Sequence, residues 1–130
     1  QNNLAVQTLD LMEQKIPRNI RPMPFGLLYE ISNLYYSAGA TDRYREIAKE
    51  LEQIALDAIE QNPQDIQSYY NPYRVLIDIY DNTKDYENAY KLWQKLEVMY
   101  PNDQSVKANV EKYRKLIQKD DVVKDTGIVN

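Results

Sequence analysis

Carboxylates are the side chains through which this protein could perform acid/base chemistry. The sequence contains neither cysteine nor histidine, so zinc sites of the Cys/His kind, thiol nucleophiles, disulfides and histidine-based catalysis are excluded. Asp78 and Asp81 lie three residues apart, a spacing that would bring two carboxylates together on one helix. Such a pair is far more common on a solvated helix face, and Asp120 and Asp121 have weaker support still. We therefore expect no enzyme, no catalytic residue, no metal site and no cofactor.

The charge and the hydropathy of the sequence argue against two further classes of protein. Sixteen basic and twenty acidic residues give a net charge of −4, with both signs interspersed, so the basic stripe that binds nucleic acid is missing. No apolar run approaches the roughly eighteen residues that a membrane span needs, and no signal peptide opens the chain. Because the first residues already have a helical pattern, we expect a domain excised from a longer protein.

The segment from Tyr70 to Pro101 predicts two helices joined by a polar turn. The first helix, from about Ile66 to Asp81, has apolar residues at intervals of three and four: Tyr73, Leu76, Ile77 and Tyr80. The second helix has the same pattern at Ala89, Leu92, Trp93, Leu96 and Met99. Residues Asn82 to Asp85 form the turn, and Pro101 ends the second helix. So short a turn predicts antiparallel packing of the two helices.

An earlier segment repeats this arrangement. Phe25 to Ala38 predicts a helix that Gly39 caps, and Asp42 to Gln61 predicts its partner, which ends at Asn62 and Pro63. The inward residues Leu28, Ile31 and Tyr35 have the relative spacing of Tyr73, Leu76 and Tyr80. The small residues Ala55 and Ala58 fit the later pattern only if about two helical turns are inserted after Tyr35. The first repeat is therefore expected to be the longer one.

The flanking segments complete a single domain over residues 1–119. Asn3 to Ile16 predicts an amphipathic helix, and Pro17 to Pro24 a stiff linker that carries Arg18 and Arg21. A last helix is expected after Asn102, ending at about Lys119, and a disordered tail over residues 120–130. Three aspartates are expected to cap helices: Asp42, Asp85 and Asp103.

The spacing of the later segment resembles the tetratricopeptide repeat (TPR), a helix-turn-helix unit of about 34 residues. Its pattern of aromatic-x2-Leu-x3-Tyr, Ala-x3-aromatic and Pro is matched at Tyr73, Leu76, Tyr80, Ala89, Trp93 and Pro101. The resemblance implies an all-α fold, a TPR-like α-α superhelix of antiparallel helix pairs with about six helices. Ile77 departs from the small residue usual at its position. The alternative is an ordinary helical hairpin in an unrelated bundle.

A second resemblance covers Leu9 to Gly39. This run looks like the soluble C-terminal region of bacterial multi-pass membrane proteins related to protein O-mannosyltransferases. In those proteins a Met-x3-Ile-Pro segment precedes a helix that ends in a Tyr and a Gly, and the corresponding residues are Met12, Ile16, Pro17, Tyr35 and Gly39. The resemblance implies a parent that is a membrane-anchored, glycosyltransferase-like protein, with this domain on the extracytoplasmic (periplasmic) face. No catalytic residue of the transferase can be transferred onto this chain.

The repeat reading also predicts where a ligand would bind. In this repeat class the first helix of each pair lines a concave groove, at positions between the buried ones. Those positions are Tyr29, Asn33, Tyr36, Asn71, Arg74, Asp78 and Asp81. Asn33 and Arg74 could hold a peptide backbone or a carboxylate, while Tyr29 and Tyr36 could stack on a side chain or a sugar. The alternative is that these are only solvated surface residues.

Three functions follow from these expectations. The first is a non-catalytic interaction or scaffold module with a protein or peptide partner. The second is a module that holds an acceptor peptide or a glycan, for which the twelve tyrosines of the chain would supply binding surface. The third is a purely structural spacer. Exposed tyrosines would favour the second function over the third.

Overall fold

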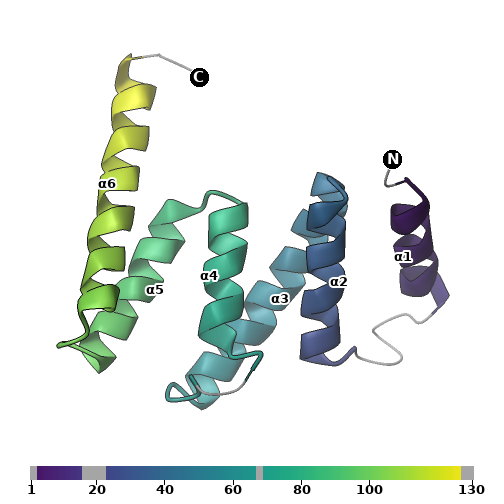
Figure 1. The fold of residues 1–130 in the computed structure, drawn as a ribbon, viewed down its shortest axis with the longest axis horizontal. Helices are drawn as coiled ribbons and strands as arrows, with labels where there is room; N and C mark the ends of the chain where they lie inside the picture. The colour runs from purple at the N-terminus through teal and green to yellow at the C-terminus, as the bar shows by residue number, and fades with distance from the viewer. Residues whose placement is uncertain (1–2, 16–22, 67–68, 127–130) are drawn as a thin grey trace. The chain divides into compact units, whose positions relative to one another are not determined.

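The structure is a computed structural model that describes residues 3–15, 23–66 and 69–126. Over these residues the chain forms six α-helices and no β-strand (Figure 1). The helices are α1 (Asn3–Lys15), α2 (Phe25–Ser37), α3 (Thr41–Gln61), α4 (Pro72–Asn82), α5 (Tyr86–Met99) and α6 (Gln104–Thr126). The predicted all-α class with six helices is confirmed. Within the described residues, no helix combines the length and the apolar character that crossing a membrane requires.

The chain divides into two compact units, Gln1–Leu76 and Ile77–Asn130. In the first unit α2 packs along α3, and α1 packs on α2. The buried apolar side chains of these helices include Leu9, Leu28, Ile31, Tyr35, Ile47, Leu51 and Ala55. In the second unit α5 packs along α6, and the buried side chains include Ala89, Leu92, Leu96, Val106 and Tyr113. These regularly spaced apolar residues therefore face the interior of their unit.

Two turns of the same geometry follow α2 and α4. After α2, Gly39 has a positive φ of 74°, and the N–H groups of Gly39 and Ala40 donate to the carbonyls of Tyr36 and Tyr35. This is a Schellman motif, in which a left-handed residue lets two backbone donors close the last helical turn. The predicted cap at Gly39 is confirmed.

The turn after α4 repeats this pattern with a lysine at the left-handed position. Lys84 has a φ of 56°, and the N–H groups of Lys84 and Asp85 donate to the carbonyls of Asp81 and Tyr80. The Asp85 side chain then accepts a hydrogen bond from the N–H of Asn88, so Asp85 caps α5 as predicted. The predicted polar turn is in the expected place, although Asn82 is itself the last residue of α4.

The lengths of the partner helices differ as expected. Helix α3 has 21 residues and α5 has 14, so α3 is longer by about two turns. The predicted cap at Asp42 is wrong, because Ala40 occupies the N-cap of α3 and Asp42 lies in the first turn. Its carboxylate still suits the positive end of the helix dipole.

Two predicted helix ends are wrong. Helix α4 begins at Pro72, not near Ile66, because proline fits the first helical position, where no N–H donor is needed. Helix α6 continues to Thr126, beyond the predicted end at Lys119, since no glycine or proline interrupts it before Gly127. Most of the predicted linker from Pro17 to Pro24 lies outside the described residues.

Candidate functional site

The first three predicted groove residues lie on α2, and they differ in exposure. Tyr29 is buried, with 8% of its surface exposed, and its ring meets that of Tyr70 edge-on at 6.0 Å. Asn33 is partly exposed. Tyr36 is half-exposed and packs at 5.1 Å against the ring of Tyr44 on α3. A ligand on this helix could therefore reach Tyr36 and Asn33 but little of Tyr29.

Asn71 and Arg74 lie at the start of α4. The Asn71 side chain accepts a hydrogen bond of 2.9 Å from the N–H of Arg74, so its oxygen caps the helix. The Arg74 guanidinium lies 5.6 Å from the ring centroid of Tyr69, a cation–π contact at an exposed position. Arg74 therefore presents a positive charge to solvent, whereas the side chain of Asn71 is used to cap the helix.

Tyr70 joins these residues to α2. Its ring contacts both Tyr69 and Tyr29, and its hydroxyl donates to Glu30 at 3.1 Å. Partial burial and the Glu30 carboxylate together raise the pKa of Tyr70. The ring lies so close to Gly26 that a Cβ at this glycine would come within 2.6 Å of it. A glycine in the first turn of α2 thus makes room for Tyr70.

Asp78 and Asp81 belong to the second unit. Asp78 is half-buried, and a carboxylate oxygen of Asp81 accepts a hydrogen bond from the hydroxyl of Tyr113 on α6. Burial, followed by the contact with Asp81, raises the pKa of Tyr113. The Asp81 carboxylate therefore has a partner within the second unit.

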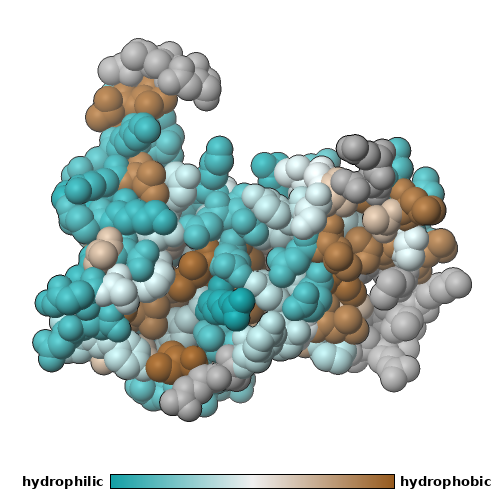
Figure 2. All heavy atoms as spheres, in the orientation of Figure 1, coloured by the Kyte–Doolittle hydropathy of each residue, from teal (hydrophilic) through white to brown (hydrophobic). Residues whose placement is uncertain are grey.

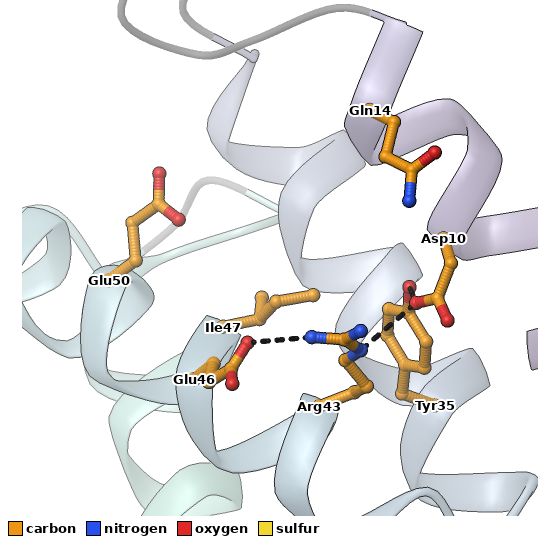
Figure 3. A pocket seen from close by; sticks show the side chains of 7 residues that line it. All are labelled: Asp10, Gln14, Tyr35, Arg43, Glu46, Ile47 and Glu50. Carbon is orange, nitrogen blue, oxygen red and sulfur yellow. Dashed lines mark hydrogen bonds and ion pairs between the residues drawn. The ribbon is translucent and has the colours of Figure 1, made fainter.

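A polar cavity of about 410 Å³ lies among α1, α2 and α3 (Figure 3). We call it the Arg43 cavity. Its lining residues are Asp10, Gln14, Tyr35, Arg43, Glu46, Ile47 and Glu50. Helix α1 supplies the first two, α2 supplies Tyr35, and α3 supplies the rest at intervals that bring them onto one helix face.

A chain of polar contacts runs across this cavity. The fully buried Tyr35 donates its hydroxyl proton to Asp10 at 2.8 Å, and the same carboxylate lies 3.1 Å from the Arg43 Nε. On its other side, Arg43 approaches Glu46 at 3.4 Å. Asp10 foremost, and then Glu46, raise the pKa of the Arg43 guanidinium. Figure 3 shows the guanidinium lying between the two carboxylates.

A second hollow, an apolar groove, lies between α1 and α2. We call it the α1/α2 groove, and its lining residues are Leu4, Ala5, Thr8, Leu9, Leu34, Ser37 and Ala38. Its volume is about 620 Å³. Leu4 is 76% exposed and Leu34 is 56% exposed, so both rims of the groove are apolar side chains in contact with water. Hydrophobic residues gather over these helices in Figure 2.

Neither hollow was predicted from the sequence. The i,i+3 spacing of Arg43 and Glu46 could have indicated an ion pair, but Asp10 reaches Arg43 only through the packing of α1. For the groove, the available signal was an excess of leucine on α1 and α2 beyond one buried stripe: Leu4, Leu11, Leu27 and Leu34 are all exposed.

Metal binding has no support in the described residues, because no group of three acidic side chains there is placed to hold an ion. The two hollows and the helical hairpins are therefore the features that bear on function. Comparison with known proteins adds nothing to either, since no family model, no curated protein and no solved structure matches this chain.

Proposed function

We propose that this chain is a non-catalytic protein-interaction module, and that the α1/α2 groove binds an amphipathic helix of a partner protein. The observation that carries the proposal is the exposure of Leu4 and Leu34 on the two rims of an apolar groove. Contiguous apolar surface of this kind marks interaction sites, because leaving it in water is unfavourable.

The shape of the groove favours a helix as its occupant. Small side chains line it at Ala5, Ser37 and Ala38, so a backbone can approach closely between the leucines. A groove between two helices accepts the apolar face of a third helix through residues spaced by three and four. An extended strand would find no unpaired backbone here, because α1 and α2 satisfy their own hydrogen bonds.

The acidic character of the chain favours a basic partner. Among the side chains that the structure describes on α1 and α2, the charged ones are Asp10 and Glu30. A helix with leucines on one face and lysines along its edges would thus complement both the apolar groove and the acidic residues of the two helices that form it. Such a partner also fits the net charge of −4 on the whole chain.

The repeated hairpin turns support the TPR-like part of the proposal. The turns at Gly39 and Lys84 have the same hydrogen bonds and lie 45 residues apart. In both, a tyrosine carbonyl (Tyr35 or Tyr80) accepts the outer bond. This spacing is longer than the about 34 residues of a TPR unit. The difference is consistent with the extra turns of α3. We propose on this basis that the chain is a diverged TPR-like helical repeat.

The resemblance around Met12 and Pro17 carries the remaining part of the proposal. It favours a parent that is a membrane-anchored, glycosyltransferase-like protein of a bacterium, with this module on the periplasmic side. Binding of an acceptor peptide or a glycan by Asn33, Tyr36 and Arg74 remains the second candidate, since Tyr36 and Arg74 are exposed. A peptide helix in the groove is favoured because the groove residues lie together, on two packed helices.

The groove proposal can be tested with a designed peptide. A helical peptide of leucine and lysine with an amphipathic pattern is titrated into the protein, and a peptide of the same composition in scrambled order is the control. The double variant Leu4→Gln, Leu34→Gln should bind about tenfold more weakly or worse, because two anchor contacts are lost. Val98→Gln, at a residue that is 82% exposed on α5, is the matched control.

Two results would contradict the proposal. One is equal affinity of the wild type and the double variant for the amphipathic peptide. The other is self-association of the wild type that the double variant abolishes, as measured by analytical ultracentrifugation, since a second copy of this chain would then occupy the groove.

A further inference from the structure

The α1/α2 groove exists only while α1 lies in its place on α2. Helix α1 supplies one wall, with Leu4, Ala5, Thr8 and Leu9. Helix α2 supplies the other wall, and the Gly39 turn joins α2 to α3. The contacts that fasten α1 therefore also shape the groove. An inference about these contacts rests on the proposed function and concerns how its binding site is formed.

Apolar burial alone gives α1 little support. Among the α1 side chains that the structure describes, Leu9 is the one buried apolar residue, whereas Leu4 and Leu11 are exposed. A helix of 13 residues is marginal in water unless tertiary packing supports it, and a single buried leucine is little packing of this kind. The residue next to Leu9 supplies further contacts.

That residue is Asp10, and one of its carboxylate oxygens has a partner on each of two other helices. The hydroxyl of the fully buried Tyr35 on α2 donates to this oxygen at 2.8 Å, and the Arg43 Nε on α3 lies 3.1 Å from it. Both contacts are charge-assisted, which makes such bonds roughly twice as strong as neutral ones. Figure 3 shows Asp10 extending from α1 toward both side chains. Asp10 thus connects α1 to both helices of the neighbouring hairpin.

We propose that Asp10 is a positioning residue of the α1/α2 groove, which fastens α1 to α2 and α3 and thereby sets the affinity of the groove for its partner helix. Asp10 does not line the groove, so it acts through the position of α1. Loss of its two contacts lowers the fraction of molecules in which α1 is docked, and the apparent affinity falls with that fraction. The coupling is reciprocal, because a partner helix that packs on Leu4 stabilises the docked α1.

The test measures peptide affinity and amide hydrogen exchange in the same variants of the full chain. The amphipathic peptide of leucine and lysine is titrated into Asp10→Ala and into the wild type. We expect the variant to bind about fivefold to tenfold more weakly, and its α1 amides to exchange about tenfold faster without peptide, while the amides of α3 keep their rates. Asp10→Asn, which keeps an oxygen acceptor for Tyr35, should lie between the two.

Glu46→Ala is the matched control. It removes the same charge, and a carboxylate that also contacts Arg43, but it leaves both contacts of Asp10 in place. It should bind the peptide and exchange its α1 amides as the wild type does. In Asp10→Ala, saturating peptide should slow the exchange of α1 amides more than that of α3 amides, whereas a general loss of stability would affect both helices alike.

The outcomes separate this inference from the proposed function. Unchanged α1 exchange in Asp10→Ala, or faster exchange with unchanged peptide affinity, would overturn the role of Asp10 and leave the groove proposal in place. Equal weakening in Glu46→Ala would overturn it too, because charge and not the position of α1 would then set the affinity. Failure of the wild type to bind the peptide would contradict the proposed function itself, and this inference with it.

Discussion

The hydroxyl of Tyr113 on α6 donates a hydrogen bond to a carboxylate oxygen of Asp81 near the end of α4. The tyrosine is buried, with 1% of its surface exposed, while Asp81 reaches water. The second unit thus uses one long side chain to connect its last helix to the helix that precedes the Lys84 turn. Asp81 is one of the predicted groove residues, and its carboxylate accepts this hydrogen bond from within the second unit.

Tyr113→Phe removes this hydrogen bond and keeps the ring. Unfolding in urea should show a loss of about 1 to 2 kcal/mol, because the acceptor is charged but remains partly hydrated. Tyr113→Ala should lose about 3 to 5 kcal/mol, since it also leaves a cavity. Asp81→Asn is the control for the charge. If Tyr113→Phe were as stable as the wild type, the bond would contribute nothing to folding.

The same pair predicts a loss of stability in alkali. Burial and Asp81 raise the pKa of Tyr113 in the folded protein above its ordinary value near 10. The contribution of Tyr113 is therefore complete below about pH 10 and is lost as the pH rises toward the raised pKa, because the unfolded chain ionises first. The stability difference between the wild type and Tyr113→Phe, measured by urea unfolding, should narrow above pH 10. A constant difference would argue against this linkage.

The contact between Gly26 and Tyr70 predicts that Gly26→Ala destabilises the protein when Tyr70 is present and stabilises it when Tyr70 is replaced by alanine. In the wild type, Gly26→Ala should destabilise the protein, because the new methyl group would lie 2.6 Å from ring atoms of Tyr70 and force the ring to move. In a Tyr70→Ala background the same substitution should stabilise it by up to about 1 kcal/mol, the advantage of alanine over glycine in a helix. Thermal unfolding of the four proteins of this cycle measures the coupling. Additive effects would show that the ring moves aside without cost.

Substitutions at the two left-handed turn residues, Gly39 and Lys84, should change the stability of the protein in opposite directions. Gly39→Ala should cost about 1 kcal/mol through backbone strain alone, since a Cβ there would meet no neighbour within 4 Å. Lys84→Gly should raise stability by up to about 1 kcal/mol, because it relieves the strain of a φ of 56°. The free energy of unfolding of each variant, measured by guanidinium-induced unfolding and compared with that of the wild type, tests both predictions. A stable Gly39→Ala protein would mean that the turn can change its conformation.

The Asp103 cap predicts weaker folding in acid. Its carboxylate accepts hydrogen bonds from the Ser105 hydroxyl and from the N–H groups of Ser105 and Val106, which lower the pKa of Asp103. Its contribution is therefore present above about pH 4 and is lost as the pH falls through the lowered pKa. Asp103→Asn keeps a capping oxygen but does not titrate. The melting temperature of the wild type should fall toward that of Asp103→Asn as the solution is acidified, and parallel curves would contradict the prediction.

The sequence predicted the features that depend on near neighbours along the chain. The spacing of apolar residues located all six helices, and local turn chemistry located Gly39, Asp85 and Asp103. The predicted start of α4 and end of α6 were wrong because helix ends depend on weak preferences that a few residues can shift.

The features that the sequence did not predict depend on residues far apart along the chain. Tyr70 reaches Glu30 across 40 positions, and Tyr35 reaches Asp10 across 25. No periodicity encodes such contacts, because they follow from how helices pack once formed. The burial of Tyr29 has the same origin: its partner Tyr70 comes from the segment before α4. The Arg43 cavity, to which α1, α2 and α3 each contribute, could therefore be recognised only in three dimensions.

The position of the single tryptophan makes the two units separately observable. Trp93 lies on α5, its indole N–H is buried, and it is the one tryptophan of the sequence. Its fluorescence therefore follows the unfolding of the second unit, whereas circular dichroism follows the helices of both. Coincident curves from the two signals would mean that the whole chain unfolds in one cooperative step, and displaced curves that the unit carrying both hollows unfolds on its own.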